Sequence, residues 1–509
     1  MEAFSLLGTG FEQLFQPIIM GALVVGLLLG LVIGVIPGVG GTTGVAVLLP
    51  LTVLMPPTAA LVMLAAIYWG ALYGGSIASI LFGVPGNPWS VATMFDGRPM
   101  ARMGQAALAL ALAFAVSFVG AILASLLFTT FALPFAGIAL RFGPPEQFAI
   151  LLIAFGTFVG MGGNPFKALV MMAVGFLLAS VGLDVITGQP RLNYGTITLM
   201  QGFHFVPVTI ALFGIGEILA NAAERYKLKI EVMAAASRLG LGDVVDAIRR
   251  VIRHGRLVLF SSLMGFFVGV LPGAGATPSS FIAYGLARRF SRNPERFGQG
   301  EPTGVMAPEA ANNAAGTGAI LPLLVLGIPG SPTAAVIMAG IFMWGFIPGP
   351  RLFTENVELV WPFIASLYVA NVLAVIICMS ATPILASILR TPYGLLVPII
   401  AMLSILGAWA IRFSEFDVWL MILLGFLGFV LRRLNYPLAP LVVALVLGFP
   451  TETAFRQTLI MGGGSPLILF SRPIAAASMV IAILFFFLPV LQVLLRGVIR
   501  RVGAKVSPA

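Results

Sequence analysis

The chain has 509 residues, of which 59% are hydrophobic and 9% are charged, and its formal net charge is +10. Soluble domains carry about 25% charged residues, so this composition excludes an ordinary water-soluble fold and predicts an all-α polytopic membrane protein. The basic residues gather in short loops, and the preference of Lys and Arg for the cytoplasmic side explains the net charge without a nucleic-acid partner.

Apolar stretches recur along the whole chain, and at about 20 residues per crossing we expect roughly ten to twelve membrane segments. The clearest candidates are residues 17–36, 106–131, 148–181, 257–271, 361–389, 395–411, 418–431 and 473–495. The first turns hold Glu2 and Glu12 but no Lys or Arg, which indicates an N-terminus outside the cell rather than a cleaved signal peptide. The basic tail indicates a cytoplasmic C-terminus.

We expect four parts in the chain. They are a first transmembrane repeat (1–222), a cytoplasmic linker (223–256), a second transmembrane repeat (257–472), and an extra C-terminal helix with a basic tail (473–509). The linker holds eight Lys or Arg and four acidic residues, so it is the one stretch with a soluble composition. It is predicted to form short amphipathic helices on the inner membrane surface, with a docking surface for a partner as the alternative.

Two motifs occur twice, in the same order. Gly30–Thr42 returns as Gly265–Thr277 with 7 of 13 positions identical, and Gly83–Pro88 returns as Gly327–Pro332 with 4 of 6 identical. Internal duplication of an apolar chain with paired Pro-Gly interruptions is typical of secondary transporters.

Equivalent loops of the two repeats differ in charge. The loop near 54–58 has no charged residue, whereas its equivalent, 288–296, holds four arginines. Conversely, the loop 96–104 carries two arginines, and its equivalent, 348–358, carries two glutamates against one arginine. Since basic loops stay in the cytoplasm, equivalent loops should lie on opposite sides of the membrane. The charges therefore predict inverted repeats.

The first motif of each repeat should break a membrane helix. Proline lacks an amide donor and clashes with the preceding turn, and the neighbouring glycines favour a loop. The half-helix that follows presents free N–H groups and about half a positive charge, which can hold an anionic substrate. The residues expected to do so are Pro37, Gly38, Gly40, Thr42 and Thr43 in the first repeat, and Pro272, Gly273, Gly275 and Thr277 in the second.

The second motif places a small polar residue between two prolines, as at the tip of a helical hairpin. Asn87 and Ser331 are suited to contact the substrate there, while the carbonyl groups of Gly86 and Gly330 can coordinate a cation. The alternative is that all four motifs are packing kinks, because Pro and Gly are common in transmembrane helices.

One polar run has no equivalent in the first repeat. Glu309, Asn312 and Asn313 are spaced three or four apart, so they share one face of a helix. Ionisable side chains inside a membrane indicate an ion or substrate path; the alternative is that Glu309 caps a helix N-terminus. We expect Asn312 and Asn313 to bind substrate. The residues expected around a coupling ion are Glu309, Thr317, Ser76 and Ser79. For the two serines, an ordinary contact between helices is an equally good explanation.

These motifs resemble those of the large membrane subunit of tripartite tricarboxylate transporters. The matching segments are Gly34–Gly40, Tyr73–Ser79, Gly83–Gly86, Phe95–Ala101, Gly269–Gly275, Pro308–Asn313 and Gly327–Gly330. The resemblance implies a carrier in a bacterial inner membrane that works with a small four-helix membrane subunit and a periplasmic solute-binding receptor. The receptor would deliver citrate or a related carboxylate, and no cofactor is expected.

Import of a trivalent anion into an inside-negative cell opposes about 2.3 kcal/mol per charge per 100 mV, roughly 7 kcal/mol in all. It therefore needs cotransported Na⁺ or H⁺, or an ATP motor. None of the four lysines lies in a phosphate-binding loop pattern, so a cation gradient is the expected drive, with transient Na⁺ as the only metal. A carboxylate channel or another ion-coupled permease is the main alternative.

An intramembrane enzyme is a weaker alternative. Gly240–Asp243 matches the Gly-x-Gly-Asp pattern of membrane aspartyl proteases, but it lies in the charged linker and has no Tyr-Asp partner in the chain. The two histidines, His204 and His254, are too far apart to form a His-Glu-x-x-His zinc site. We therefore expect no enzymatic activity.

Overall fold

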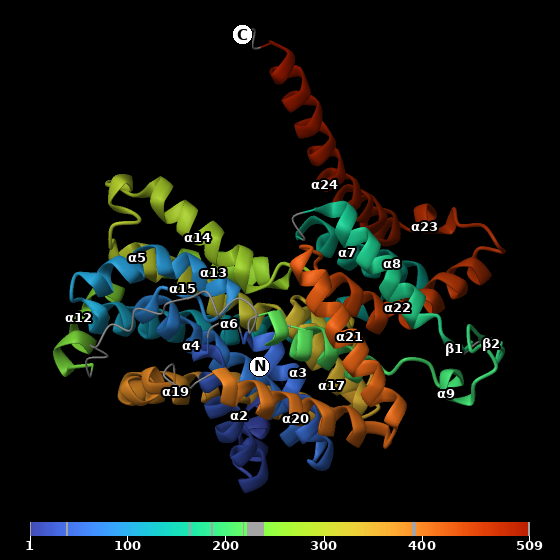
Figure 1. Cartoon of the computed structure of the whole chain (residues 1–509), viewed down its shortest axis with the longest axis horizontal. Coiled ribbons are helices and arrows are strands. Elements are labelled where there is room, and N and C mark those ends of the chain that lie inside the picture. Colours follow the sequence, from blue (N-terminus) through green and yellow to red (C-terminus); the bar gives the residue numbers. More distant parts are fainter. Residues whose placement is uncertain are drawn as a thin grey trace. The chain divides into compact units, whose positions relative to one another are not determined.

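The structure is a computed structural model, and it describes residues 2–36, 39–161, 164–184, 187–216, 218–220, 239–388 and 393–506. Helices make up nearly all of its regular structure (Figure 1). The chain divides into two compact units, here called the first unit (Met1–Leu140 and Thr209–Phe429) and the second unit (Arg141–Val208 and Val430–Ala509). Each unit draws on both halves of the chain.

The first unit contains most of the helices. They are α1 (Glu2–Leu14), α2 (Pro17–Val35), α3 (Gly41–Leu48), η1 (Leu49–Leu54), α4 (Pro57–Phe82), η2 (Pro88–Ser90), α5 (Val91–Arg102), α6 (Ala106–Ala139), η3 (Ile210–Ile215), α12 (Leu241–Arg253), α13 (Gly255–Val270), α14 (Ala276–Phe290), η4 (Pro294–Arg296), α15 (Pro302–Gly318), α16 (Ile320–Leu326), α17 (Pro332–Met343), α18 (Leu352–Glu355), α19 (Val357–Ile388) and α20 (Tyr393–Arg412).

The second unit is smaller. Its elements are α7 (Pro144–Met161), α8 (Pro165–Ala179), β1 (Gly182–Leu183), β2 (Pro190–Arg191), α9 (Ile197–Met200), α22 (Ala439–Met461), α23 (Ile468–Ser471) and α24 (Pro473–Val506). The helices α10 (Phe205–Thr209) and α21 (Glu415–Arg433) run across the unit boundaries.

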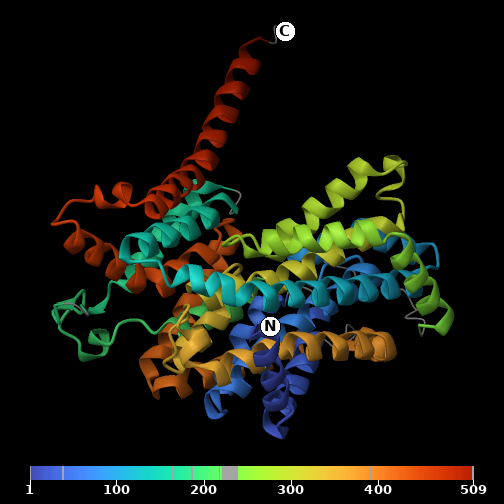
Figure 2. The ribbon, with the colours of Figure 1, turned by 180° about the vertical axis from the view of Figure 1, so that it is seen from behind.

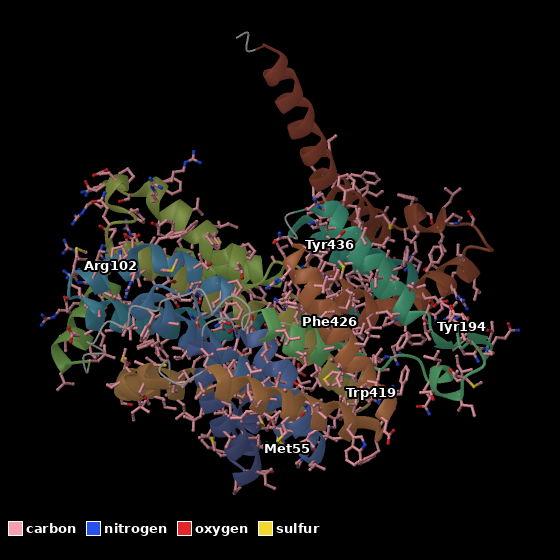
Figure 3. The ribbon with its side chains drawn as sticks, viewed as in Figure 1. Met55, Arg102, Tyr194, Trp419, Phe426 and Tyr436 are labelled. Carbon is pink, nitrogen blue, oxygen red and sulfur yellow. The ribbon has the colours of Figure 1, made fainter. Side chains whose placement is uncertain are left out.

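Five helices in the described part of the chain are long and apolar enough to cross a membrane: α2, α4, α6, α19 and α22. A sixth span results if α12 and α13, which are bent by 77°, count as one. Large apolar side chains also point outward, such as Trp419 (69% exposed) and Phe426 (60% exposed) on α21 (Figure 3). The chain is an all-α polytopic membrane protein, as predicted, while the larger number of segments stays a prediction that depends on the shorter helices.

Glycines bring α2 into close contact with α4. A Cβ added to Gly34 would lie 2.6 Å from the carbonyl oxygen of Ala71, and one added to Gly30 would meet the carbonyl oxygen of Ile67. Real Cβ atoms essentially never approach a neighbour within 3.0 Å, and a backbone carbonyl inside a helix cannot move aside. The two helices can therefore pack this closely only with glycine at both positions.

The same packing occurs between α13 and α15 in the second half. Added Cβ atoms on Gly265 and Gly269 would meet the carbonyl oxygens of Ala311 and Ala315 at equally forbidden distances. The glycines are shifted by 235 residues from those on α2 (265 minus 30), and their contact partners by 244 (311 minus 67). These are the offsets of the duplicated motifs, so equivalent residues make equivalent contacts.

Equivalent helices also end alike. α4 ends at Gly83 with φ 65°, and α16, which continues α15 after Ala319, ends at Gly327 with φ 68°. This left-handed conformation is strained for residues with a Cβ, which explains why glycine ends both helices.

α4 and α15 run in opposite directions. The start of α4 is marked by Thr58, whose hydroxyl donates to the carbonyl oxygen of Glu358 at 3.3 Å. The last turn of α4 contacts α5, because the side chain of Arg98 on α5 donates to the carbonyl oxygen of Leu81 on α4. α15 begins beside α5, where Gly304 contacts Asp96. Further along α15, Gly316 contacts Leu72 in the middle of α4. Two helices with equivalent sequences are therefore antiparallel.

Asp96 joins two basic segments: helix α5, which carries Arg98 and Arg102, and the stretch 288–301 at and after the end of α14, which carries four arginines. Its Oδ1 accepts hydrogen bonds from the backbone N–H groups of Gly298, Gly300 and Glu301 at 2.8, 2.9 and 2.8 Å, and its Oδ2 accepts one from the Tyr284 hydroxyl at 2.9 Å. The carboxylate is fully buried. The basic loops of the two halves therefore lie at the same end of the unit.

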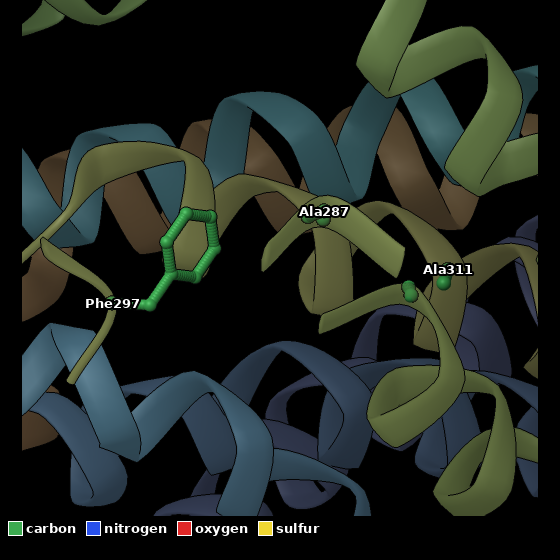
Figure 4. Packing of buried hydrophobic residues seen from close by; sticks show 5 residues of the cluster. Ala287, Phe297 and Ala311 are labelled. Atoms are coloured by element: carbon green, nitrogen blue, oxygen red, sulfur yellow. The ribbon is translucent and has the colours of Figure 1, made fainter. Parts of the chain in front are cut away.

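A small apolar cluster lies beside this carboxylate. Phe297 packs against Ala287 of α14 and Ala311 of α15 (Figure 4). The alanines let α14 and α15 approach closely enough for the Phe297 ring to fill the gap between them.

Seen from behind, α6 is the long cyan helix that packs along α15 and α19 (Figure 2).

Replacing Asp96 by Ala should loosen the loop it holds. Three backbone N–H groups lose their acceptor, and each orphaned donor costs about 1–3 kcal/mol. We expect hydrogen exchange at Gly298, Gly300 and Glu301 to accelerate at least about ten-fold, because local opening becomes easier. Mass spectrometry of the exchanged protein measures this. An unchanged exchange rate would show that the loop is held by other contacts.

In the second unit, paired charges fix the β1–β2 hairpin to α22. Arg191 donates to both carboxylate oxygens of Glu452, at 2.8 and 3.2 Å. Arg456 bridges Glu452 at 2.6 Å and Asp184 at 2.9 Å. A further pair joins Arg472 to Glu146. These three arginines are thus neutralised by acidic side chains.

Candidate functional site

The first Pro-Gly motif separates two helices, as predicted. α2 ends at Val35 and α3 begins at Gly41, with Gly40 in extended backbone (φ −67°, ψ 164°) as its N-cap. Pro37 and Gly38, which were expected to form the break, lie outside the described residues.

Asn87, the predicted hairpin tip, holds the start of α3. Its Oδ1 accepts a hydrogen bond from the backbone N–H of Gly41 at 2.7 Å, and its Nδ2 donates to the carbonyl oxygen of Ala71 at 3.1 Å. Ala71 lies 14 residues after the start of α4 and 11 before its end, so the tip reaches the middle of that helix. Gly86 packs directly on the carbonyl oxygen of Gly34, which leaves no room for a side chain.

The second half forms a similar junction. α13 ends at Val270 and α14 begins at Ala276, so the predicted break at Pro272 is present. The backbone N–H of Gly273 donates to the carbonyl oxygen of Pro329 at 3.3 Å. The two motifs of this half therefore touch through their backbones.

The hairpin of the second half is held against α15. The N–H of Gly330 donates to the carbonyl oxygen of Ala319 at 3.1 Å. Ser331 accepts from the N–H of Ala334 at 3.1 Å and so caps α17. A Cβ on Gly275, where φ is 62°, would lie 2.9 Å from the Cβ of Ser331. The two motifs pack together as closely as those of the first half.

The junctions of the two halves meet each other. The hydroxyls of Thr42 and Thr333 are 2.8 Å apart although 291 residues separate them. The hydroxyl of Tyr68 on α4 lies against Ser331. All four motifs therefore converge beside the middle of α4, and we call this convergence the motif junction.

Two predicted threonines lie at the edge of the motif junction. Thr43 is buried and donates to the carbonyl oxygen of Phe213 at 2.6 Å. Thr277 is half-buried in the first turn of α14, where its carbonyl oxygen accepts a hydrogen bond from Ser280. Thr43 thus fixes α3 to the π-helical turn η3.

Glu309 lies in a second polar cluster, within α15. Its Oε1 accepts a hydrogen bond from the Thr93 hydroxyl at 2.6 Å and its Oε2 one from the Ser117 hydroxyl at 3.1 Å. The side chain is fully buried, and no salt bridge reaches it among the described residues. Since α15 begins at Pro302, the alternative that Glu309 caps a helix start is wrong.

The two asparagines extend this cluster. The Nδ2 of Asn313 donates to the Ser117 hydroxyl at 2.8 Å and to Asn312 Oδ1 at 2.6 Å. Ser76 of α4 lies next to the Glu309 carboxylate. The Glu309 cluster thus joins α4, α5, α6 and α15.

Several polar atoms of the Glu309 cluster and its helix lack a partner. Among the residues that the structure describes, these buried atoms are Ser76 Oγ, Asn312 Nδ2, Asn313 Oδ1 and Thr317 Oγ1. Buried polar groups almost always have a hydrogen-bond partner, and exceptions concentrate where a ligand or ion binds. Ser76 Oγ beside the buried carboxylate and Asn313 Oδ1 one turn along α15 suit a small cation, whereas Thr317 lies two turns from Glu309.

Ser79 differs from the other predicted residues. Its hydroxyl donates to the Ser90 hydroxyl at 2.8 Å, which in turn donates to the carbonyl oxygen of Asn87. Ser79 therefore supports the hairpin tip one turn away from Ser76. Three residues of these clusters, Thr93, Ser117 and Thr333, were not predicted from the sequence. Of these, only Ser117 stands out in the sequence, as a lone polar residue in an apolar run.

Comparison with known proteins identifies the family. Residues 20–443 match the tripartite tricarboxylate transporter TctA family. A protein of Agrobacterium vitis, described as an uncharacterized 52.8 kDa protein in the TAR-I ttuC′ 3′ region, is 37% identical over 484 residues, covering 95% of each chain. A second, from the TAR-II ttuC′ 3′ region, is 38% identical over 213 residues, which cover 42% of this chain and 88% of the relative. No solved structure gives a significant match. The chain belongs to the TctA family of tripartite tricarboxylate transporters.

Proposed function

We propose that the chain is the membrane-embedded carrier of a tripartite uptake system and imports citrate or a related carboxylate. The observation that carries the proposal is the motif junction. Four helix breaks from two halves meet midway along α4, which is where transporters of duplicated architecture bind substrate. α3, α14 and α17 start in this region, and the positive ends of their dipoles attract a carboxylate without a buried basic side chain.

The two halves act as inverted repeats. The antiparallel course of α4 and α15 supports this, as does the hydrogen bond of Thr58 to Glu358 in the first turn of α19. The arginine-rich loops joined by Asp96 then lie in the cytoplasm of the bacterium and the loop at Leu54 outside. Met55 and Arg102 lie at separate edges of the first unit (Figure 3), in agreement with this assignment. The N-terminus is outside the inner membrane and the C-terminus inside.

The Glu309 cluster binds the coupling cation, Na⁺ or H⁺. A carboxylate buried without a basic partner is unstable unless a proton or cation neutralises it, and the side-chain oxygens of Ser76 and Asn313 lie beside it on α4 and α15. A small four-helix membrane subunit and a periplasmic solute-binding receptor complete the system, and the receptor supplies the carboxylate.

Uptake by proteoliposomes that contain this chain and its partner subunits tests the proposal. Labelled citrate should accumulate against its gradient when Na⁺ or H⁺ is higher outside, and accumulation should stop when both gradients are collapsed. Equilibration without accumulation would indicate a channel. Continued accumulation without either gradient would overturn cation coupling.

Labelling of single cysteines tests the orientation. With Cys378 replaced by Ala, a cysteine at Leu54 (95% exposed) should react with an impermeant maleimide added outside the cell. A cysteine at Arg102 should react only after the membrane is permeabilised. Reaction of both from the same side would contradict the inverted arrangement.

Replacing Asn87 by Ala should slow uptake about ten-fold without affecting insertion. The N–H of Gly41 and the carbonyl of Ala71 lose their partner, which shifts the start of α3 at a cost of about 1–3 kcal/mol. Asn164→Ala is the matched control, because Asn164 caps α8 with its side chain at an exposed position. Initial rates of citrate uptake at equal protein levels measure the effect. Normal rates in Asn87→Ala would remove Asn87 from the site.

A further inference from the structure

A short helix with an unusual surface precedes the second transmembrane half. The 13-residue α12 carries Leu241, Val245, Ile248 and Ile252 at the spacing of one helix face. All four are exposed, by 86, 45, 47 and 75%, whereas Ala247 on another face is buried where α12 packs on α6. The four residues, here called the apolar stripe, therefore point away from the protein.

Arginines border the apolar stripe on one side. At about 100° per residue, Arg249 and Arg253 lie roughly 80° and 120° around the helix from Leu241. Both are exposed, as is Arg256 at the start of α13, and in the described part of the chain none of the three pairs with a carboxylate. Arg250, on the far side, is instead paired with Asp246 at 3.0 Å. Unpaired positive charge thus lies on the side of α12 next to the stripe and at the start of α13.

The helix that follows fixes how α12 lies relative to the membrane. α13 leads toward the motif junction, and α12 is bent from it by 77°. A helix at such an angle to a membrane-entering segment lies near the plane of the bilayer surface. The arginines and the stripe then lie at the level where headgroups meet acyl chains, which is how amphipathic helices bind membranes.

We propose that α12 binds anionic phospholipids of the cytoplasmic leaflet. The phosphate groups pair with Arg249, Arg253 and Arg256, since guanidinium groups bind phosphate through two parallel hydrogen bonds. The apolar stripe inserts between the acyl chains. The side of the membrane follows from the proposed orientation of the repeats, but binding of lipid does not depend on transport.

A lipid fits this surface better than a protein does. The stripe continues directly into a membrane helix, so bilayer lies beside it. The unpaired arginines complement an anionic surface, which attracts each basic residue near it and favours its binding about five-fold. A soluble phosphate compound would pair with the arginines but would leave the stripe in water.

Fluorescence quenching in nanodiscs tests the insertion of the stripe. A bimane label is attached to Ile252→Cys in the full chain with Cys378→Ala, in discs of phosphatidylcholine with or without 30% phosphatidylglycerol. We expect quenching by lipid-bound nitroxide and protection from iodide when phosphatidylglycerol is present. Quenching by iodide alone in both discs would overturn the proposal, and protection from both quenchers would reveal a protein covering the stripe.

Retention of phosphatidylglycerol tests the arginines. The triple variant Arg249→Gln, Arg253→Gln, Arg256→Gln should bind it at least ten-fold more weakly in native mass spectrometry. The matched control removes three arginines at and just after the end of α14: Arg288→Gln, Arg289→Gln and Arg292→Gln.

The control should retain the lipid, and glycerol 3-phosphate should not displace it. Equal losses in both variants, or displacement by the soluble phosphate, would refute a site on α12. All six arginines are at exposed positions, so the fold should be kept. Because no readout involves uptake, failure of the proposed carrier function would leave these results unaffected.

Discussion

Replacing Glu309 by Gln lowers carboxylate uptake by about 100-fold or more while leaving insertion and folding unchanged. The amide has the same shape; its oxygen can accept the hydrogen bond from Thr93 and its N–H can donate to the Ser117 hydroxyl, so the packing of α15 is preserved. It lacks the charge that attracts a cation, and a charge pair 4 Å apart is worth about 4 kcal/mol at an effective dielectric constant of 20. Initial uptake rates at matched protein levels measure the loss.

The matched control for this variant is Glu358→Gln, which makes the same chemical change at an exposed position in the first turn of α19. It should transport normally. Measuring the dependence of wild-type uptake on Na⁺ at fixed pH, and on pH at fixed Na⁺, identifies the cation. Normal uptake by Glu309→Gln would remove the carboxylate from the coupling mechanism.

The second large effect concerns the paired glycines. Gly30→Ala and Gly265→Ala should each strongly reduce the yield of folded protein, because the new methyl group would overlap the carbonyl oxygen of Ile67 or Ala311. Overpacking typically costs about 1–3 kcal/mol and more where only backbone can move. Since the two positions are equivalent in the repeats, the two losses should be similar.

Gly21→Ala and Gly285→Ala are the controls for these variants. Both glycines lie in helices, and an added Cβ at either would meet no atom within 4 Å. Thermal unfolding of the detergent-solubilised protein compares the four variants. The controls should match the wild type or exceed it slightly, since alanine favours helix. If all four behaved alike, close helix packing would not explain the glycines.

Local chemistry made the helix breaks predictable. Proline cannot donate an amide hydrogen bond, so α2 and α13 end at Val35 and Val270, just before Pro37 and Pro272. The left-handed ends at Gly83 and Gly327 follow in the same way from the absence of a Cβ. Such constraints act within a few residues and are therefore visible in the sequence.

Partners from distant segments were not predictable. Thr93 and Ser117 bind Glu309 across 216 and 192 residues, and a threonine or serine in an apolar helix often bonds only to its own backbone. Ser79 was grouped with Ser76, yet the return of the chain after Asn87 gives it Ser90 as a partner. Even the alternative role of Glu309 as a helix cap was excluded only when the start of α15 was known.

The sequence by itself determined the membrane class, the duplication, the places where helices break and the family, because hydrophobicity and the backbone limits of Pro and Gly act locally. Tertiary structure alone decided that the four motifs meet, through contacts such as Thr42 with Thr333, and which hydroxyls surround the buried carboxylate. The physical reason is that these contacts depend on how helices far apart in the chain pack, and that packing follows from many glycine and alanine contacts together.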